Sequence, residues 1–213
     1  MAGAAARSAR VGSRPGCRLS LCTHRDIRTI ANILRVDHAG ERGAIAIYQA
    51  QIWVARRSAT DLQEFLATSI DDERRHLMVF EQLMRDRDII PCRTLSFWGL
   101  GGFLLGFTTS LLGRDAILVC TEAVERTVHR HLVDQMDWLA TRDVEIVTAI
   151  TSIQAEELAH LQFAQGERKD LGDALGLRVL DTLVAASTEA LIWVSTYGAS
   201  SRMVAGIGSK RGR

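Results

Sequence analysis

Two copies of a Glu-x-x-His motif occur in the sequence, Glu73 with His76 in "DDERRH" and Glu157 with His160 in "AEELAH". On an α-helix, side chains three residues apart lie on one face, so each motif presents a carboxylate and an imidazole to a common point. Both groups are metal ligands, and this combination favours iron or manganese over copper or a structural zinc. A single Glu-x-x-His is common and usually solvated, so one copy would not indicate a metal site.

The spacing around the two motifs makes the indication stronger. A further glutamate lies 32 residues before each motif, and the whole set repeats with an offset of 84 positions. This regularity indicates an internal duplication of a helix pair. Four ionised carboxylates do not share an apolar interior without cations, whereas four carboxylates and two imidazoles are the ligand set of di-iron carboxylate proteins. The predicted ligands are Glu41, Glu73, His76, Glu125, Glu157 and His160.

Five other polar residues lie close in sequence to the predicted ligands: His38, Asp72, Glu122, His129 and Glu156. The two histidines lie one helical turn from a ligand and either orient it or are ordinary helix residues. Glu122 is a rival to Glu125, but the 32-residue spacing selects Glu125. Asp72 and Glu156 each precede a ligand by one position, which turns them about 100° around the helix. We expect these two to be solvated or to support a ligand.

Apolar residues recur every three or four positions in four segments, and the prediction is therefore four amphipathic helices. They cover about residues 26–56, 60–87, 118–139 and 150–164. The chain contains only two prolines, Pro15 and Pro91, so few positions interrupt a helix. Four such helices with short connections predict an all-α, antiparallel four-helix bundle, forming one domain over about residues 26–200.

Two more segments, residues 95–112 and 176–197, are mostly apolar. The first belongs to a run of twenty residues without a charge, between Arg93 and Arg114. It could be a re-entrant or interfacial helix, a full membrane span or a buried core helix. Its glycines, serines and threonines disfavour the span, so we predict membrane-associating helices that lie in one leaflet.

Residues 1–25 contain five arginines and no acidic residue. This composition is typical of a mitochondrial transit peptide, and a disordered basic tail is the alternative. The formal net charge of the whole chain is +1, which gives no indication of nucleic-acid binding. The four cysteines include no Cys-x-x-Cys pair, so the sequence predicts neither a zinc knuckle nor a disulfide framework.

Four stretches of the sequence together resemble a known family. These are "RVDHAGERGA", "DDERRHL", "TEAVERTVHRHL" and "AEELAHLQ", each of which contains predicted ligands. They are similar to the demethoxyubiquinone hydroxylases of ubiquinone biosynthesis, over about residues 26–200. The resemblance implies a ferritin-like di-iron monooxygenase with the six ligands already listed. Its reaction would be the penultimate step towards ubiquinone, with O2 and with electrons from NADH.

The resemblance also implies a location and partners. The enzyme would lie peripherally on the matrix side of the mitochondrial inner membrane and take a polyprenyl quinone from the bilayer. A lipid-binding accessory protein and other enzymes of the ubiquinone pathway would bind it. Two other functions fit the same ligands: an iron-oxidising or iron-storing ferritin-like protein, and a non-catalytic quinone carrier with a structural metal site. Residues 201–213 are a tail to which no role is assigned.

Overall fold

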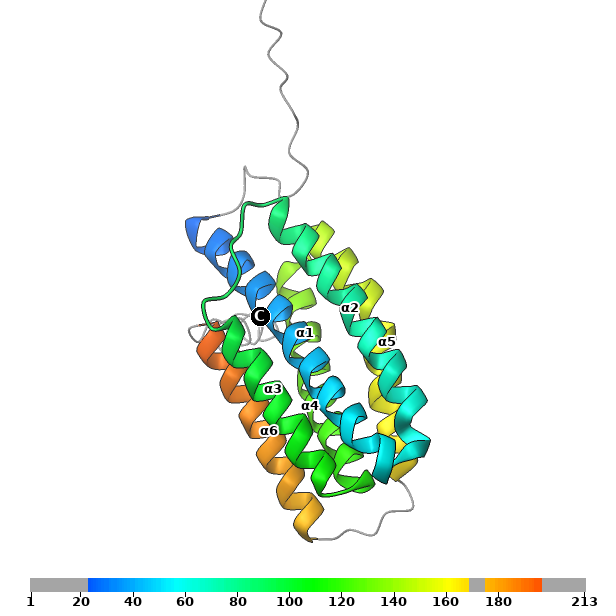
Figure 1. The fold of residues 1–213 in the computed structure, drawn as a ribbon. Helices are drawn as coiled ribbons and strands as arrows, with labels where there is room; N and C mark the ends of the chain where they lie inside the picture. The colour runs from blue at the N-terminus through cyan, green and yellow to red at the C-terminus, as the bar shows by residue number, and fades with distance from the viewer. Residues whose placement is uncertain (1–22, 169–174, 197–213) are drawn as a thin grey trace, which may run out of the picture.

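The computed structural model describes residues 23–168 and 175–196, and all regular structure in these residues is helical (Figure 1). The long helices are α1 (His24–Ser58), α2 (Gln63–Arg85), α3 (Leu95–Leu111), α4 (Arg114–Leu139), α5 (Val144–Arg168) and α6 (Leu175–Ser195). A short 3-10 helix, Thr60–Leu62, precedes α2. Residues 1–22 of the predicted transit peptide lie outside the described residues, and so does the whole of the predicted tail.

The four predicted amphipathic helices correspond to α1, α2, α4 and α5, so the predicted helical bundle is confirmed. Helix α1 begins where the side chains and backbones of Thr23 and Asp26 form a reciprocal capping box. Helix α4 begins four residues before the apolar stripe that predicted it, and α5 extends beyond its stripe at both ends. These extensions contain further core residues, including Ile117 and Ile146, which are fully buried.

Two apolar clusters fill the bundle at opposite ends. One contains Leu34, Phe80, Leu139 and Ile150, and the other contains Leu66 and Ile117 with their neighbours. In each of the four helices the predicted ligands lie between residues of one cluster and residues of the other. The predicted ligands therefore lie in the middle of the bundle, with packed hydrocarbon on both sides.

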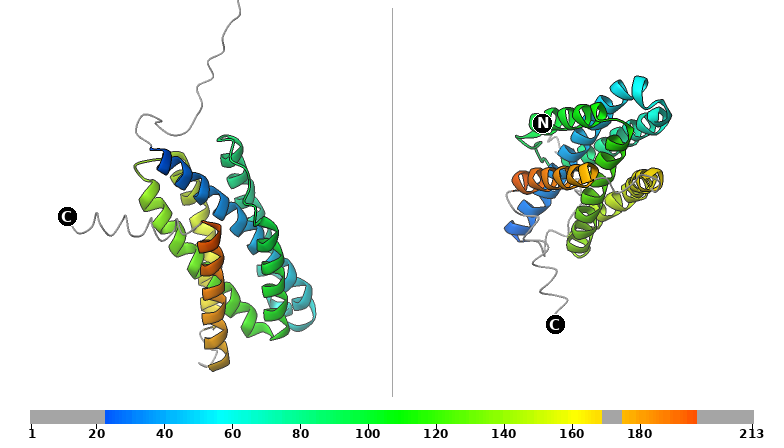
Figure 2. Two further views of the ribbon diagram at one scale, coloured as in Figure 1. Left: turned by 90° about the vertical axis from the view of Figure 1, so that its left-hand side faces the viewer. Right: turned by 90° about the horizontal axis from the view of Figure 1, so that it is seen from below.

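Helices α3 and α6 cover the same side of this bundle, α3 packed on α1 and α6 on α4 (Figures 1 and 2). Adding the offset of 84 to α3 gives residues 179–195, which lie within α6, so the internal duplication includes these helices. Glycines allow α3 to approach α1 closely. A Cβ atom at Gly102 would overlap the backbone of Gly43, and one at Gly106 would overlap that of Ile47.

The apolar segment 95–112 is thus a helix with one face against the bundle and another exposed. Phe97, Leu100, Phe103, Leu104 and Leu111 of α3 all have exposed side chains. Leu175, Val179, Leu183 and Trp193 of α6 are exposed as well. None of the described helices is long and apolar enough to cross a membrane. Association of this face with a membrane surface stays a prediction.

Candidate metal centre

The structure brings the six predicted ligands together in the bundle interior, where each is no more than 8% exposed. Their ligand atoms form two groups, and within each group the atoms lie within 4.8 Å of one another. The first group is Glu41, Glu73, His76 and Glu157, and the second is Glu73, Glu125, Glu157 and His160. Glu73 and Glu157 belong to both groups. This arrangement could hold two cations, with two carboxylates shared between them.

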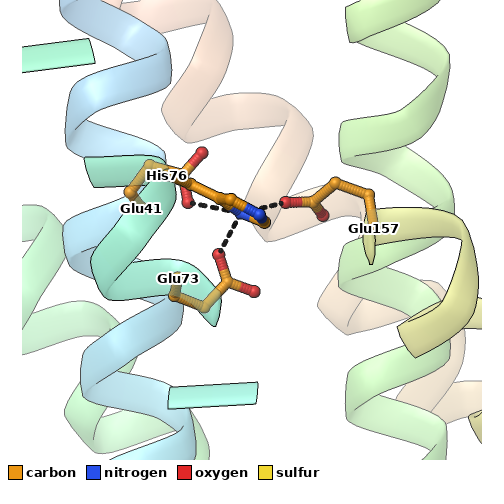
Figure 3. Close-up of side chains that lie close together, drawn as sticks. All are labelled: Glu41, Glu73, His76 and Glu157. Atoms are coloured by element: carbon orange, nitrogen blue, oxygen red, sulfur yellow. Dashed lines mark ion pairs between the residues drawn. The ribbon is translucent and has the colours of Figure 1, made fainter. Parts of the chain in front are cut away.

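The first group surrounds the imidazole of His76, as Figure 3 shows. Its Nδ1 atom lies 3.0 Å from Glu157 Oε1, 3.4 Å from Glu73 Oε2 and 3.8 Å from Glu41 Oε2. In the second group, Nδ1 of His160 lies 3.4 Å from Glu73 Oε1. The Nδ1 atoms of both histidines therefore face the carboxylates.

The opposite ring nitrogen of each histidine binds a carboxylate from the other half of the molecule. His76 Nε2 lies 2.7 Å from Glu156 on α5, and His160 Nε2 lies 3.0 Å from Asp72 on α2. Arg75 joins these carboxylates, donating to Asp72 at 2.5 Å and to Glu156 at 3.0 Å. Asp72 and Glu156 thus support the ligands. The 100° offset did not predict which residues they would contact.

The hydrogen bonding of the imidazoles fits a pair of bound metal ions. A carboxylate at Nε2 holds a proton on that nitrogen and leaves Nδ1 with a lone pair, which is the form of histidine that binds metal. The buried Nδ1 atoms of His76 and His160 have no hydrogen-bond partner in the part of the chain that the structure describes, and the same is true of Glu73 Oε1. Buried polar atoms without partners are rare, and metal ions would satisfy these three.

The charges of the cluster fit cations as well. Burial and the neighbouring Glu73 raise the pKa of Glu41 well above its usual value, and burial and Glu157 do the same for Glu125. Glu73 is different: burial acts to raise its pKa, but the nearby imidazoles of His160 and His76 outweigh this effect and lower the pKa to about 2. The carboxylates also raise the pKa of both histidines despite burial. Protons thus balance the charge in the metal-free protein, and cations would replace them.

Tyr48 is a member of the site that sequence reasoning missed. Its hydroxyl donates a hydrogen bond to Glu125 Oε1 at 2.5 Å, and its side chain is buried. Burial and the charge of Glu125 raise the pKa of Tyr48 well above its usual value, so it remains a donor. In the sequence this tyrosine is one of the apolar-stripe residues of the first helix. Its position seven residues after Glu41, about two helical turns along the same face, was the available signal.

The other polar residues singled out in the sequence lie outside both groups. Glu122 forms ion pairs with Arg126, at 3.3 Å, and with Arg168, which turns it away from the ligands. His38 Nε2 lies 3.7 Å from Glu81 on α2. His129 is half-buried on α4. The selection of Glu125 over Glu122 by spacing agrees with this geometry.

A cavity of about 380 Å³ opens beside the cluster, between α1, α3, α4 and α6. All four glutamates of the cluster line it. Most of the remaining lining is apolar and includes Trp98, Leu105, Val128, Leu191 and Ile192. The volume is within the range of small-molecule sites. A ring-sized apolar molecule in this cavity would lie against the carboxylate cluster.

Comparison with known proteins agrees with these features. Residues 28–195 match the model of a family described as "Ubiquinone biosynthesis protein COQ7". A similar protein, the 3-demethoxyubiquinol 3-hydroxylase of Rhodospirillum rubrum, is 36% identical over 168 residues, which are 78% of this chain and 77% of that protein. The mitochondrial NADPH-dependent 3-demethoxyubiquinone 3-hydroxylases of Rattus norvegicus and Homo sapiens are 34% and 32% identical over 170 residues, 78% of this chain and 76% of each relative.

Proposed function

The chain belongs to the ubiquinone biosynthesis protein COQ7 family, and from this premise we propose that it is a ferritin-like di-iron monooxygenase that hydroxylates the ring of demethoxyubiquinone. The observation that carries the proposal is the pair of ligand groups that share Glu73 and Glu157 at the end of an apolar cavity. Similarity to hydroxylases named for this substrate supplies the identity of the ring.

In this proposal Glu41 and His76 would hold one iron, and Glu125 and His160 would hold the other. Glu73 and Glu157 belong to both ligand groups and would contribute to both sites. Carboxylate oxygens with imidazole suit iron or manganese. Bound iron would supply the redox chemistry needed to activate O2. Overall, a ring C–H group, O2, two electrons and two protons give a ring hydroxyl and water. Glu156 and Asp72 keep the proton of each imidazole on Nε2, and Tyr48 holds Glu125 in place by its hydrogen bond.

The cavity binds the substrate ring and excludes water around it. Its wall of Trp98, Leu105 and Ile192 offers apolar contact to a ring, while the cluster lies at one side of the cavity. A polyprenyl quinone dissolves in lipid and not in water, so its tail stays in a bilayer. Helices α3 and α6, which line the cavity, also carry several exposed large apolar side chains. This supports docking of these two helices on a membrane.

The location, partners and electron donor in this proposal come from the family. Residues 1–25 direct the chain to the mitochondrion, and it lies peripherally on the matrix side of the inner membrane. There it binds a lipid-binding accessory protein and other enzymes of ubiquinone biosynthesis. A reduced nicotinamide supplies the electrons. The sequence resemblance implied NADH, whereas the names of the rat and human relatives specify NADPH, so turnover with each nucleotide identifies the donor.

Metal analysis and turnover test the central proposal. The full chain, purified with lipid and loaded anaerobically with ferrous iron, should bind two irons and show the Mössbauer spectrum of a coupled pair. With O2 and reductant it should hydroxylate a short-tailed demethoxyubiquinone, and the His160→Ala variant should not. Many more than two irons per chain would instead identify a storage protein. Full ring hydroxylation by His160→Ala would leave the metal site a structural role only.

Vesicle binding tests the membrane surface. We expect the full chain to sediment with vesicles of inner-membrane lipid composition, and the double variant Phe97→Glu/Phe103→Glu to sediment less. Met78→Glu is the matched control, because Met78 is an exposed apolar side chain on α2, away from this face. Equal loss in the control variant would contradict docking through α3.

A further inference from the structure

Two polar side chains that line the cavity each have an oxygen atom without a hydrogen-bond partner among the described residues. Asp37 on α1 accepts a hydrogen bond from Gln135 Nε2 on α4 at 2.7 Å, through its Oδ1 atom. Its other oxygen, Oδ2, is buried, and so is Gln135 Oε1, yet neither has a hydrogen-bond partner among the described residues. Both residues line the cavity.

The other polar residues of the cavity wall, away from the cluster, are already engaged. The hydroxyls of Ser187 and Thr188 donate to the carbonyl oxygen of Val184. His131 Nε2 lies 3.0 Å from Glu189. The unpartnered oxygens of Asp37 and Gln135 therefore differ from these groups in being free to bind a molecule in the cavity.

The pair lies within reach of a ring that also touches the cluster. Asp37 precedes Glu41 by one helical turn, which places it about 6 Å further along the axis of α1. Glu41 and Asp37 both line the cavity, as does Glu125, which lies on the same helix as Gln135. A molecule that spans about one helical turn of α1 can therefore contact both the pair and the cluster.

The chemistry of the two oxygens selects the ligand group. Buried acceptors without donors cost free energy, so the pair favours a ligand that donates. Burial also raises the pKa of Asp37 to about 7, against the opposing effect of the Gln135 hydrogen bond, so Asp37 occurs both with and without a proton near neutral pH. A hydroxyl group suits both states, since it donates to Gln135 Oε1 or to ionised Asp37 and accepts from protonated Asp37. A carbonyl or ether oxygen only accepts, and would leave Gln135 Oε1 unpaired.

We propose that Asp37 and Gln135 form a recognition site for one ring hydroxyl of a hydroquinone bound in this cavity, the form of the ring for which the Rhodospirillum rubrum relative is named. The inference rests on the proposed function, because it assigns two residues of that same cavity to positioning the substrate. Asp37 and Gln135 are positioning residues here: they fix the ring by one oxygen and so direct one edge of it towards the carboxylate cluster.

Calorimetry under anaerobic conditions tests the site without turnover. The probes are a demethoxy hydroquinone with one isoprene unit and its dimethyl ether, which cannot donate. The full, metal-loaded chain should bind the hydroquinone at least tenfold more tightly than the ether. Asp37→Asn should reduce this preference to less than twofold, because an amide directs a donor where the carboxylate has an acceptor. Gln135→Leu should reduce it similarly.

Matched controls separate recognition from damage to the fold. Asp134→Asn changes a carboxylate next to Gln135 on α4 that is not among the cavity-lining residues, and it should keep the tenfold preference. Melting temperatures and circular dichroism show whether each variant folds. In turnover with the hydroquinone, Asp37→Asn should raise KM at least tenfold with a smaller change in kcat.

The outcomes also separate this inference from the proposed function. Equal binding of the two probes by the unaltered chain would overturn the hydroxyl site, and so would a tenfold preference that survives in both folded variants. Either result could accompany normal ring hydroxylation, in which case the proposed function stands alone. Absence of both hydroxylation and probe binding in the unaltered, metal-loaded chain would overturn the proposed function itself.

Discussion

His160 Nε2 lies 3.0 Å from the carboxylate of Asp72, on a helix 88 positions earlier in the chain. The equivalent contact, between His76 and Glu156, has a distance of 2.7 Å. Each imidazole is thus oriented by an acid that directly precedes a cluster glutamate on the other Glu-x-x-His helix. The fixed orientation directs both Nδ1 atoms at the cluster.

Asp72→Asn should weaken metal binding by about 10- to 100-fold, because the amide holds the imidazole of His160 less firmly and makes it less basic. Competition with a coloured chelator measures the affinity. Asp71→Asn is the control, since Asp71 is exposed and pairs with Arg74 within α2. Equal affinities for the two variants would show that Asp72 does not act through His160.

Glu73→Gln should reduce the bound metal to well below one ion per chain, because Glu73 belongs to both ligand groups. Glu41→Gln should retain one ion, since Glu41 belongs to only one group. Metal content after dialysis distinguishes them, with Glu122→Gln as a control that keeps two ions. Loss of a single ion in both ligand variants would contradict the shared position of Glu73.

Tyr48→Phe should destabilise the metal-free protein by about 1 kcal/mol, the usual net value of a hydrogen bond. The variant removes only the hydroxyl that donates to buried Glu125. Chemical unfolding with and without metal measures the effect. We expect a smaller loss in the metal-loaded protein, where a cation also satisfies Glu125, and equal losses in both states would argue against Glu125 as a ligand.

Gly102→Ala should destabilise the fold by about 1 to 3 kcal/mol, because the added methyl group overlaps the backbone of Gly43 and forces α3 away from α1. Gly99→Ala, in the same helix with nothing near its Cβ position, should be neutral or stabilising by up to about 1 kcal/mol. Thermal unfolding compares the two. Equal stability of both variants would contradict the close contact.

The stability of the chain should depend on pH through Asp37. Its pKa rises from the usual 3.8 to about 7 on folding, so the folded state holds the proton more tightly. This contribution is fully present below pH 4 and is lost as pH rises to about 7. The free energy of unfolding of Asp37→Asn, relative to that of the unaltered chain, should therefore increase by about 1 to 2 kcal/mol between pH 4.5 and pH 8. This value is reduced because the side chain is partly exposed. Denaturant unfolding at both values measures the difference, and a constant difference would contradict the shift.

Sequence spacing was enough to predict the helices and the six residues that converge, since the helical repeat fixes which side chains share a face. It placed Glu41, Glu73 and His76 in one half and the equivalent residues in the other. The cross-contacts of Asp72 and Glu156 were not predictable in this way. They depend on how far apart α2 and α5 lie, which the period of one helix does not contain.

The sequence alone did not decide which kind of helix the apolar segments form. Residues 95–112 have the composition of a buried, interfacial or spanning helix, and only the fit of Gly102 and Gly106 against α1 distinguishes a packed helix with an exposed face. The cavity follows from that packing. Asp37 and Gln135, which are 98 positions apart, meet only because α1 and α4 are neighbours.

The exchange of acids between the two halves has an evolutionary consequence. A helical hairpin from either half carries a glutamate and a Glu-x-x-His motif but lacks the acid that steadies its own imidazole. Two identical hairpins around a two-fold axis would supply every missing group to each other. An ancestor encoding one hairpin could therefore have assembled the complete centre as a symmetric dimer, before gene fusion joined both copies in one polypeptide.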